Sequence, residues 1–448
     1  MKKTTLVDDY LRDYAADIKW KLTASNTNNI SMIVVIPAYA EKETLFSTLM
    51  SLAQNPVSSL DESLILCVIN NKKTSPSDDI RNNRQTIGII DALIKKKSIN
   101  NNSISPETQL LIKCLADARI NLGYIDASST GYEIPENAGG VGMARKIGMD
   151  MALRLSKEKA PARNLILSLD ADTLVRENYL PAVKNYFTKR INTAVISYEH
   201  QTPARAEEAA AICCYEIFLR YWVLGLGYAK SPWAFHSIGS TIVTTTDAYL
   251  AVRGMNKRDA GEDFYFLNKL AKISGIHYLK ETCVYPSARP STRVVFGTGK
   301  RIQRFLSGIQ QEYLLYDPKI FQVLADWLEY MRSAIDCTEN EIMTAASKIH
   351  PYLSNYLADA GFAQAWMKIR KNATDTDALL RQFNFWFDGF RTLKFVNYFT
   401  RNVYPQINMF TALGKLLFAY GDKGFNLSAD IPQLEEQWRI LQYLRNLT

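Results

Sequence analysis

Short apolar runs alternate with helix-like patterns through the first two thirds of the chain. The runs at 32–36, 64–69 and 165–169 are almost continuously apolar, which is typical of strands buried on both faces. The remaining strand patterns lie at 120–126 and 194–197 and, as expected edge strands, at 235–243 and 276–285. Helical spacing of apolar residues occurs at 87–94, 141–155, 176–189 and 206–227. This alternation predicts a Rossmann-like α/β fold with a mixed, mostly parallel sheet and helices on both faces.

The last third of the chain has a different pattern. After about residue 300 the strand signals end, and 318–448 is helical in pattern and carries four of the seven tryptophans. The first 30 residues are polar and mixed in charge, and residues 95–105 form a polar patch expected to be a surface insertion. These patterns predict an N-terminal helical lead-in at 1–31, an α/β domain at 32–305 and a C-terminal all-α domain at 306–448.

Composition and charge narrow the class of protein. The 448 residues are 47% hydrophobic and 22% charged, which is an ordinary globular balance. The net charge of +8 is compatible with an anionic substrate or a membrane surface and gives weak support for nucleic acid. Six cysteines form no CxxC, and no secretory signal is found, so reduced thiols and a cytoplasmic location are expected. The most apolar window, 221–229, is far short of the roughly 20 residues of a membrane helix.

Candidate ligand-binding residues follow three of the predicted strands. They are Pro37, Ala38, Tyr39 and Glu41 after the first strand, Asn70 and Asn71 after the second, and Asp170 and Asp172 after the strand at 165–169. Open parallel sheets bind ligands beyond the carboxyl ends of their strands. We therefore expect these side chains to gather along one edge of the sheet.

The DxD sequence occurs twice, and the two copies have different settings. Asp170-Ala171-Asp172 follows a buried strand, and two rigidly held carboxylates suit Mg²⁺ or Mn²⁺ that bridges phosphate oxygens. The alternative is that both carboxylates cap the next helix. Asp375 and Asp377 precede an apolar run within a polar segment, which predicts a helix cap and turn.

Two further clusters have both a chemical and a structural interpretation. Glu262 and Asp263 open a predicted helix, where carboxylates cap helices and where one could also act as a general base. A segment without acidic residues then carries several cations, which either close over a diphosphate or form a solvated linker. The cations are Arg289, Arg293, Lys300, Arg301 and Arg304.

The order of these motifs resembles the family 2 glycosyltransferases of GT-A fold. The resemblance covers roughly 32–300, about three fifths of the chain. Its motifs are Val-Val-Ile-Pro-Ala-Tyr-Ala-Glu at 34–41, Asn-Asn at 70–71, Gly-Met-Ala-Arg-Lys-Ile-Gly at 142–148, Leu-Asp-Ala-Asp-Thr at 169–173, Arg-Gly-Met at 253–255 and Gly-Glu-Asp at 261–263. This family implies a GT-A catalytic domain that transfers a sugar, with inversion, from a nucleoside diphosphate to an acceptor hydroxyl.

The resemblance implies a role for each matching position. Asp263 is expected to be the general base, with Glu262 as the fallback, and Asp172, with Asp170, to hold Mn²⁺ or Mg²⁺. A UDP-sugar is favoured over a GDP-sugar, and Arg293 and Lys300 are expected to stabilise the departing diphosphate. The donor-binding residues implied are Pro37, Ala38, Tyr39, Glu41, Asn70, Arg145, Asp170, Ala171, Asp172, Arg293 and Lys300.

Several departures and alternatives remain open at this point. The Gln-x-x-Arg-Trp motif and membrane helices of the processive synthases are absent, which favours a soluble enzyme with a glycan, lipid or small-molecule acceptor and leaves peripheral membrane association open. A sugar nucleotidyltransferase needs a glycine-rich, arginine-containing loop after the first strand, and Pro-Ala-Tyr-Ala-Glu stands there instead. A catalytically inactive scaffold that binds a nucleotide sugar or a protein needs neither Asp172 nor Asp263. A nucleotide-binding dehydrogenase would require glycine at Arg145.

Overall fold

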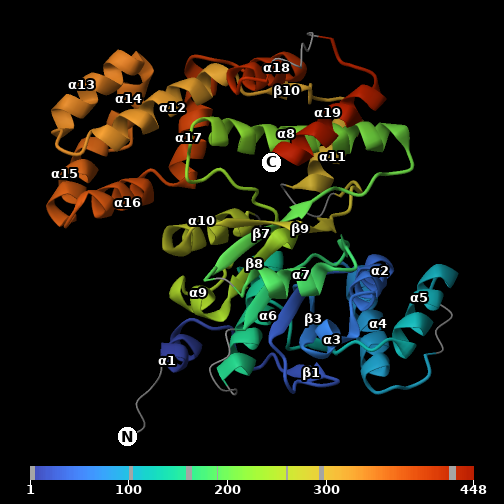
Figure 1. Cartoon of the computed structure of the whole chain (residues 1–448). Coiled ribbons are helices and arrows are strands. Elements are labelled where there is room, and N and C mark those ends of the chain that lie inside the picture. Colours follow the sequence, from blue (N-terminus) through green and yellow to red (C-terminus); the bar gives the residue numbers. More distant parts are fainter. Residues whose placement is uncertain are drawn as a thin grey trace, which may run out of the picture. The chain divides into compact units, whose positions relative to one another are not determined.

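The computed structural model describes residues 6–99, 104–157, 164–188, 190–258, 261–291, 297–422 and 430–448. The chain packs as two units (Figure 1). The first unit comprises Met1–Thr202 and Ser237–Gly299, and the second comprises Pro203–His236 and Lys300–Thr448. The segment 203–236 therefore packs with the C-terminal helices, whereas its sequence position lies inside the predicted α/β domain.

The first unit is built on a nine-stranded mixed sheet, in the order β1-β4-β3-β2-β5-β8-β7-β9-β6. Its centre is parallel and consists of β4 (Leu122–Ala127), β3 (Ser63–Asn70), β2 (Met32–Ala38) and β5 (Leu165–Ser168). Every residue of β2 and β3 is buried, as their continuous apolar runs predict. The predicted mixed, mostly parallel sheet is confirmed.

The outer strands correct three of the sequence predictions. The strand expected at 235–243 begins later in the structure. Gly239–Thr241 forms a 3₁₀ turn, and the strand that follows it, β8, is Ile242–Thr245. Both β8 and β9 (His277–Tyr285) lie inside the sheet and not at its edge, since β8 pairs with β5 and β7 (Thr193–Tyr198), and β9 pairs with β7 and β6. The edges are the short strands β1 (Leu22–Ala24) and β6 (Leu174–Val175), so the lead-in at 1–31 is not helical throughout.

Helices cover both faces of the parallel strands. The chain moves from β2 to β3 to β4 in one direction across the sheet and returns from β4 to β5 in the other. Right-handed crossovers then place α6 (Gly140–Lys157) opposite α2 (Lys42–Ala53) and α4 (Ser77–Ile94), as Figure 1 shows. The other helices of this unit are α1 (Leu6–Asp13), α3 (Val57–Asp61), α5 (Pro106–Asp117), α7 (Tyr179–Tyr186), α9 (Thr246–Ala251) and α10 (Glu262–Ser274).

Strand β2 runs two residues past its apolar run and includes Pro37. Proline lacks an N–H and is usually excluded from central strands. The carbonyl of Val35 accepts a hydrogen bond from the N–H of Leu169, so Val35, and with it Pro37 two residues on, faces β5. Because β5 ends at Ser168, Pro37 lies beyond the ladder on that side and breaks no pairing.

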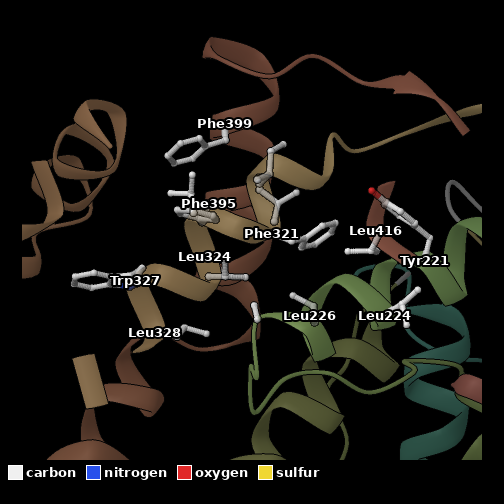
Figure 2. Packing of buried hydrophobic residues seen from close by; sticks show 14 of the residues in the cluster. Tyr221, Leu224, Leu226, Phe321, Leu324, Trp327, Leu328, Phe395, Phe399 and Leu416 are labelled. Carbon is white, nitrogen blue, oxygen red and sulfur yellow. The ribbon is translucent and has the colours of Figure 1, made fainter. Parts of the chain in front are cut away.

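The second unit is a mostly helical assembly around an aromatic core. Phe321, Leu324 and Trp327 of α12 (Pro318–Ser333) pack with Phe395 of α17 and Leu224 of α8 (Figure 2). The elements of the unit are α8 (Ala206–Tyr228), α11 (Thr298–Ser307), α12, α13 (Glu339–Ile349), α14 (Pro351–Asp359), α15 (Phe362–Asn372), α16 (Thr376–Trp386), α17 (Gly389–Asn402), α18 (Met409–Ala419), α19 (Leu434–Leu447) and the two-stranded ladder β10 (Leu314–Leu315) and β11 (Ile407–Asn408). The predicted C-terminal helical region is confirmed.

Helix α8 is the core helix of this unit. Among the described residues it is the one helix long and apolar enough to cross a membrane, yet 72% of its most apolar window is buried inside the structure. Its buried Glu216 accepts hydrogen bonds from Arg220 and, from α19, two from Arg445 at 2.8 and 3.0 Å. A charged cluster of this kind ties α19 to α8, and core packing accounts for the apolar composition of the helix.

Candidate active site

The carboxyl ends of β2, β3 and β5 bring distant polar residues to one edge of the sheet. Arg289, which follows β9, contacts the carboxylates of both Glu41 and Asp172. Its Nε lies 3.2 Å from Asp172 Oδ2. Glu41 comes from the loop after β2 and Asp172 from the turn after β5, so the predicted gathering of strand ends is present.

Arg145 of α6 is the buried hub of this edge. Its Nε donates to Ser168 Oγ at 3.1 Å, and its two terminal nitrogens contact Asp170 Oδ1 and Glu262 Oε1. The Arg145 side chain is only 4% exposed. Charge-assisted contacts to two carboxylates offset the cost of burying the guanidinium. Arg145 thereby links the turn after β5 to the start of α10.

Gly239 makes room for this guanidinium. A Cβ atom at position 239 would lie 2.3 Å from a terminal nitrogen of Arg145 and 2.7 Å from its central carbon. Any side chain there would push Arg145 away from Asp170 and Glu262. The 3₁₀ turn before β8 is therefore part of the site, although its sequence carries no motif that indicates this.

The Asp170-Ala171-Asp172 turn is held by its backbone. Thr48 Oγ1 of α2 donates to the carbonyl of Ala171 at 3.1 Å, and Gln201 Nε2 donates to the carbonyl of Asp172 at 3.0 Å. The next helix, α7, has its N-cap at Asn178, so the two aspartates do not cap it. Both carboxylates are thus held at the sheet edge by contacts other than helix capping.

The second DxD behaves as the sequence predicts. Asp375 is the N-cap residue of α16, and its side chain accepts a hydrogen bond from the N–H of Ala378 at 2.7 Å. The helix-cap interpretation of Asp375 is confirmed.

Asp172 lies in a strongly perturbed environment. Burial, followed by the neighbouring negative charges of Asp170 and Glu41, raises the pKa of Asp172 to about 6, while Arg289 opposes the shift. The side chain keeps 24% of its surface exposed, so a ligand can reach it. A carboxylate whose negative charge is only partly offset by its neighbours favours the binding of a cation.

Asp263 lies in the first turn of α10, after Gly261 in the left-handed conformation. Its Oδ1 accepts a hydrogen bond from the N–H of Phe264 at 2.7 Å, so the capping interpretation holds in part. Burial, followed by the charge of Glu262, raises the pKa of Asp263 to about 7, although Arg145 counteracts the shift. Because the buried Glu262 is engaged by Arg145, Asp263 is the better placed of the two to exchange a proton.

An asparagine that the sequence analysis did not identify organises the ends of β2 and β3. The buried Asn83 of α4 accepts from the N–H of Ala40 at 2.9 Å. Its Nδ2 donates to the carbonyl of Asn70 and to Asn71 Oδ1, both at 2.9 Å. Within the described part of the chain, the buried Oδ1 of Asn70 has no hydrogen-bond partner. A buried acceptor of this kind calls for a donor from a ligand or from water.

The remaining predicted residues occupy varied positions. Pro37 and Ala38 are buried within β2, and the hydroxyl of Tyr39 donates to Asp79 Oδ2 of α4 at 2.6 Å. Lys300 is exposed on α11 and belongs to the second unit. Arg293 lies outside the described residues. Among the residues that the structure describes, no group of three His, Cys, Asp or Glu side chains could hold a metal ion by itself.

No protein-family model matches the chain, and no curated protein matches its sequence. Solved structures are similar over most of its length. TarS 1–349 of S. aureus in complex with UDP-GlcNAc is 11% identical, with 80% of this chain and 91% of that chain covered and a TM-score of 0.38. The mannosyltransferase PcManGT of Pyrobaculum calidifontis, in complex with GDP-Man and Mn²⁺, is 13% identical, with 85% and 92% covered and a TM-score of 0.34. The glucosyl-3-phosphoglycerate synthase of M. tuberculosis is 14% identical, with 70% and 89% covered and a TM-score of 0.31.

These similar structures share 11% to 14% of their sequence with the chain. Their TM-scores are below 0.5 and carry no argument about the donor, the cation or the mechanism of this chain. Those questions rest on its own side chains.

Proposed function

We propose that the chain is an inverting glycosyltransferase that moves a sugar from a nucleoside diphosphate to an acceptor hydroxyl. The observation that carries this proposal is the hub at Arg145, which joins Asp170 after β5 to Glu262, beside Asp263. A carboxylate pair that can hold a cation and a third carboxylate with a pKa near neutrality, held at one sheet edge, suit such a transfer.

The nucleoside is proposed to lie against the ends of β2 and β3. Tyr39 offers a half-buried ring, and Asn70 offers the buried Oδ1 that can accept a hydrogen bond from an N–H of the base. Asn83 holds both strand ends in place and is a positioning residue for this pocket. A UDP-sugar remains favoured over a GDP-sugar on the sequence resemblance.

The donor set at 170–172 suits a hard divalent cation. Mg²⁺ and Mn²⁺ bind proteins through one or two carboxylates and complete their shell with phosphate oxygens and water. Asp172, with Asp170, would hold the cation. When bound, the cation supplies positive charge that offsets the charge on the departing diphosphate. Lys300 and Arg293 remain candidates for the same task.

Asp263 is proposed to take the proton of the acceptor hydroxyl. As that proton moves to the carboxylate, the acceptor oxygen attacks the anomeric carbon from the side opposite the diphosphate. The bond between the anomeric carbon and the diphosphate oxygen breaks, and the nucleoside diphosphate leaves with its electron pair. A pKa raised to about 7 keeps Asp263 basic enough for this step and still largely ionised in mildly alkaline solution.

A thermal-shift panel with UDP, GDP and their sugars, with and without Mn²⁺, tests the proposal. A ligand that binds the folded protein raises its unfolding midpoint, and the shift grows with ligand concentration. We expect a Mn²⁺-dependent shift with one nucleotide family. The turnover of the donor so identified is then followed by ¹H NMR in water. Because the transfer inverts the anomeric carbon, an α-linked donor should first release its sugar as the β-anomer. No shift with any nucleotide at millimolar concentration would favour a scaffold that binds another partner.

A further inference from the structure

Arg289 and Arg145 both contact two carboxylates of the site, but only Arg289 is placed to leave. The Arg145 side chain is 4% exposed, whereas that of Arg289 is 37% exposed. The N–H of Arg289 donates to Ser287 Oγ at 3.3 Å, so its backbone is held in a turn while its side chain reaches to the sheet edge. The guanidinium lies between Glu41 and Asp172, which come from different loops.

We propose that the Arg289 guanidinium is a built-in cation that holds the place of the divalent ion at Asp172 until that ion arrives. The inference rests on the proposed function and adds a residue to it. Arg289 contacts Asp172 Oδ2 through two nitrogens at 3.1 and 3.2 Å, so it lies against the carboxylate that would hold the divalent ion. A divalent ion held by the same carboxylate would lie close to the guanidinium, and the repulsion between the two positive charges makes them compete.

The charges around the guanidinium support its place-holding role. In the described part of the chain, the charged groups that face the guanidinium are Glu41 and Asp172, with Asp170 next to Asp172. Asp170 already contacts Arg145, but without Arg289 the carboxylates of Glu41 and Asp172 would repel each other, and Arg289 relieves that repulsion in the unliganded protein. Glu41 also accepts a hydrogen bond from Thr44 Oγ1 at 2.7 Å, which fixes it as the anchor that retains Arg289. The exchange therefore needs the guanidinium to leave only Asp172.

Titration with Mn²⁺ alone, without nucleotide, tests this exchange. Free Mn²⁺ is measured by its electron paramagnetic resonance signal in the presence of the wild type, Arg289→Gln, Arg289→Lys and the control Arg176→Gln. Arg176 is an exposed arginine of the same unit that contacts the hydroxyl of Tyr285. Removal of a competing, partly exposed ion pair should tighten Mn²⁺ binding by about fivefold in Arg289→Gln. Arg289→Lys should fall between that variant and the wild type, and Arg176→Gln should match the wild type.

Equal or weaker Mn²⁺ binding by Arg289→Gln would overturn the inference. A repeat of the titration with UDP or GDP separates this failure from that of the proposed function. If the wild type binds Mn²⁺ with nucleotide but Arg289→Gln gains nothing, the inference fails alone. If none of the four proteins binds Mn²⁺ under either condition, the cation of the proposed function and the inference fail together.

Discussion

Asp150 and Asp172 are both carboxylates of the α/β unit, and their surroundings differ in the number of donors. Asp150, on α6, accepts hydrogen bonds from the hydroxyls of Tyr10 and Tyr249 and from the N–H of Ala16, at 2.6 to 2.7 Å. Lys146 lies 3.0 Å away as its counter-ion. In the described part of the chain, Asp172 instead has only Arg289 as a side-chain donor, and Asp170 and Glu41 raise its pKa.

The same contrast separates structural from chemical carboxylates elsewhere in the chain. Glu216 in the helical unit is buried and receives donors from two arginines. Among the described residues, Asp263 accepts a hydrogen bond from one backbone N–H, and its pKa is raised. A carboxylate with a full set of internal donors stabilises the fold, whereas one left short of donors is available to a cation or a proton.

The largest expected effect is on stability and concerns Asp150, the carboxylate with a full set of donors. Asp150→Asn leaves the buried Lys146 without a counter-ion, so the free energy of unfolding should fall by about 3–5 kcal/mol. Urea unfolding followed by circular dichroism measures the loss. The control is Asp78→Asn, whose carboxylate is 83% exposed in an ion pair with Arg81 and should change the value by less than about 0.5 kcal/mol. Equal effects of the two substitutions would contradict the distinction between carboxylates that have a full set of internal donors and those that do not.

The next effect is on turnover and concerns Asp263, a carboxylate with few donors. Asp263→Asn should lower nucleotide-sugar turnover on the order of 100-fold, because the acceptor hydroxyl loses its base. Nucleotide affinity and the free energy of unfolding should not decrease, because the substitution removes a charge that burial disfavours. In the wild type the rate should rise as the pH increases through about 7, with the ionisation of this group. Release of the nucleoside diphosphate measures the rate, and wild-type turnover in Asp263→Asn would assign the base elsewhere.

A smaller effect is expected in the pH dependence of stability without ligand. The folded pKa of Asp172, about 6, is above its ordinary value of 3.8, so the folded protein binds this proton more tightly than the unfolded chain. The stability that this proton contributes is complete below about pH 4 and is lost as the pH rises through about 6. The free energy of unfolding of Asp172→Asn, relative to that of the wild type, should therefore increase by up to about 2 kcal/mol between pH 4 and pH 7. A constant difference across this range would contradict the raised pKa.

The smallest effect concerns the second DxD. Asp375→Ala removes the N-cap of α16, so it should lower the unfolding midpoint by less than Asp150→Asn does. Nucleotide and Mn²⁺ binding should not change, since Asp375 serves the helix alone. A loss of Mn²⁺ binding in this variant, measured by the same resonance signal, would break the separation of the two motifs.

Much of the first unit could be predicted because its strands are continuous apolar runs. The parallel order of β2, β3 and β5 also predicted that Asp172 would reach the same edge as Glu41. The contacts of Asn83 and Arg289 could not be predicted, since they join residues of α4 and the segment after β9 to strand ends far away in the chain. Arg289 was one of five cations in a basic segment, and sequence spacing does not report which of them meets a carboxylate.

The central claim is that Asp172 takes part in binding a nucleoside diphosphate through a divalent cation. Isothermal titration of UDP and GDP into the wild type and into Asp172→Asn, each with and without Mn²⁺, tests it most directly. The account predicts that Mn²⁺ strengthens nucleotide binding to the wild type and that Asp172→Asn loses this gain, with Asp375→Asn behaving as the wild type. The same Mn²⁺-dependent affinity in Asp172→Asn would contradict the claim and place the cation at other residues.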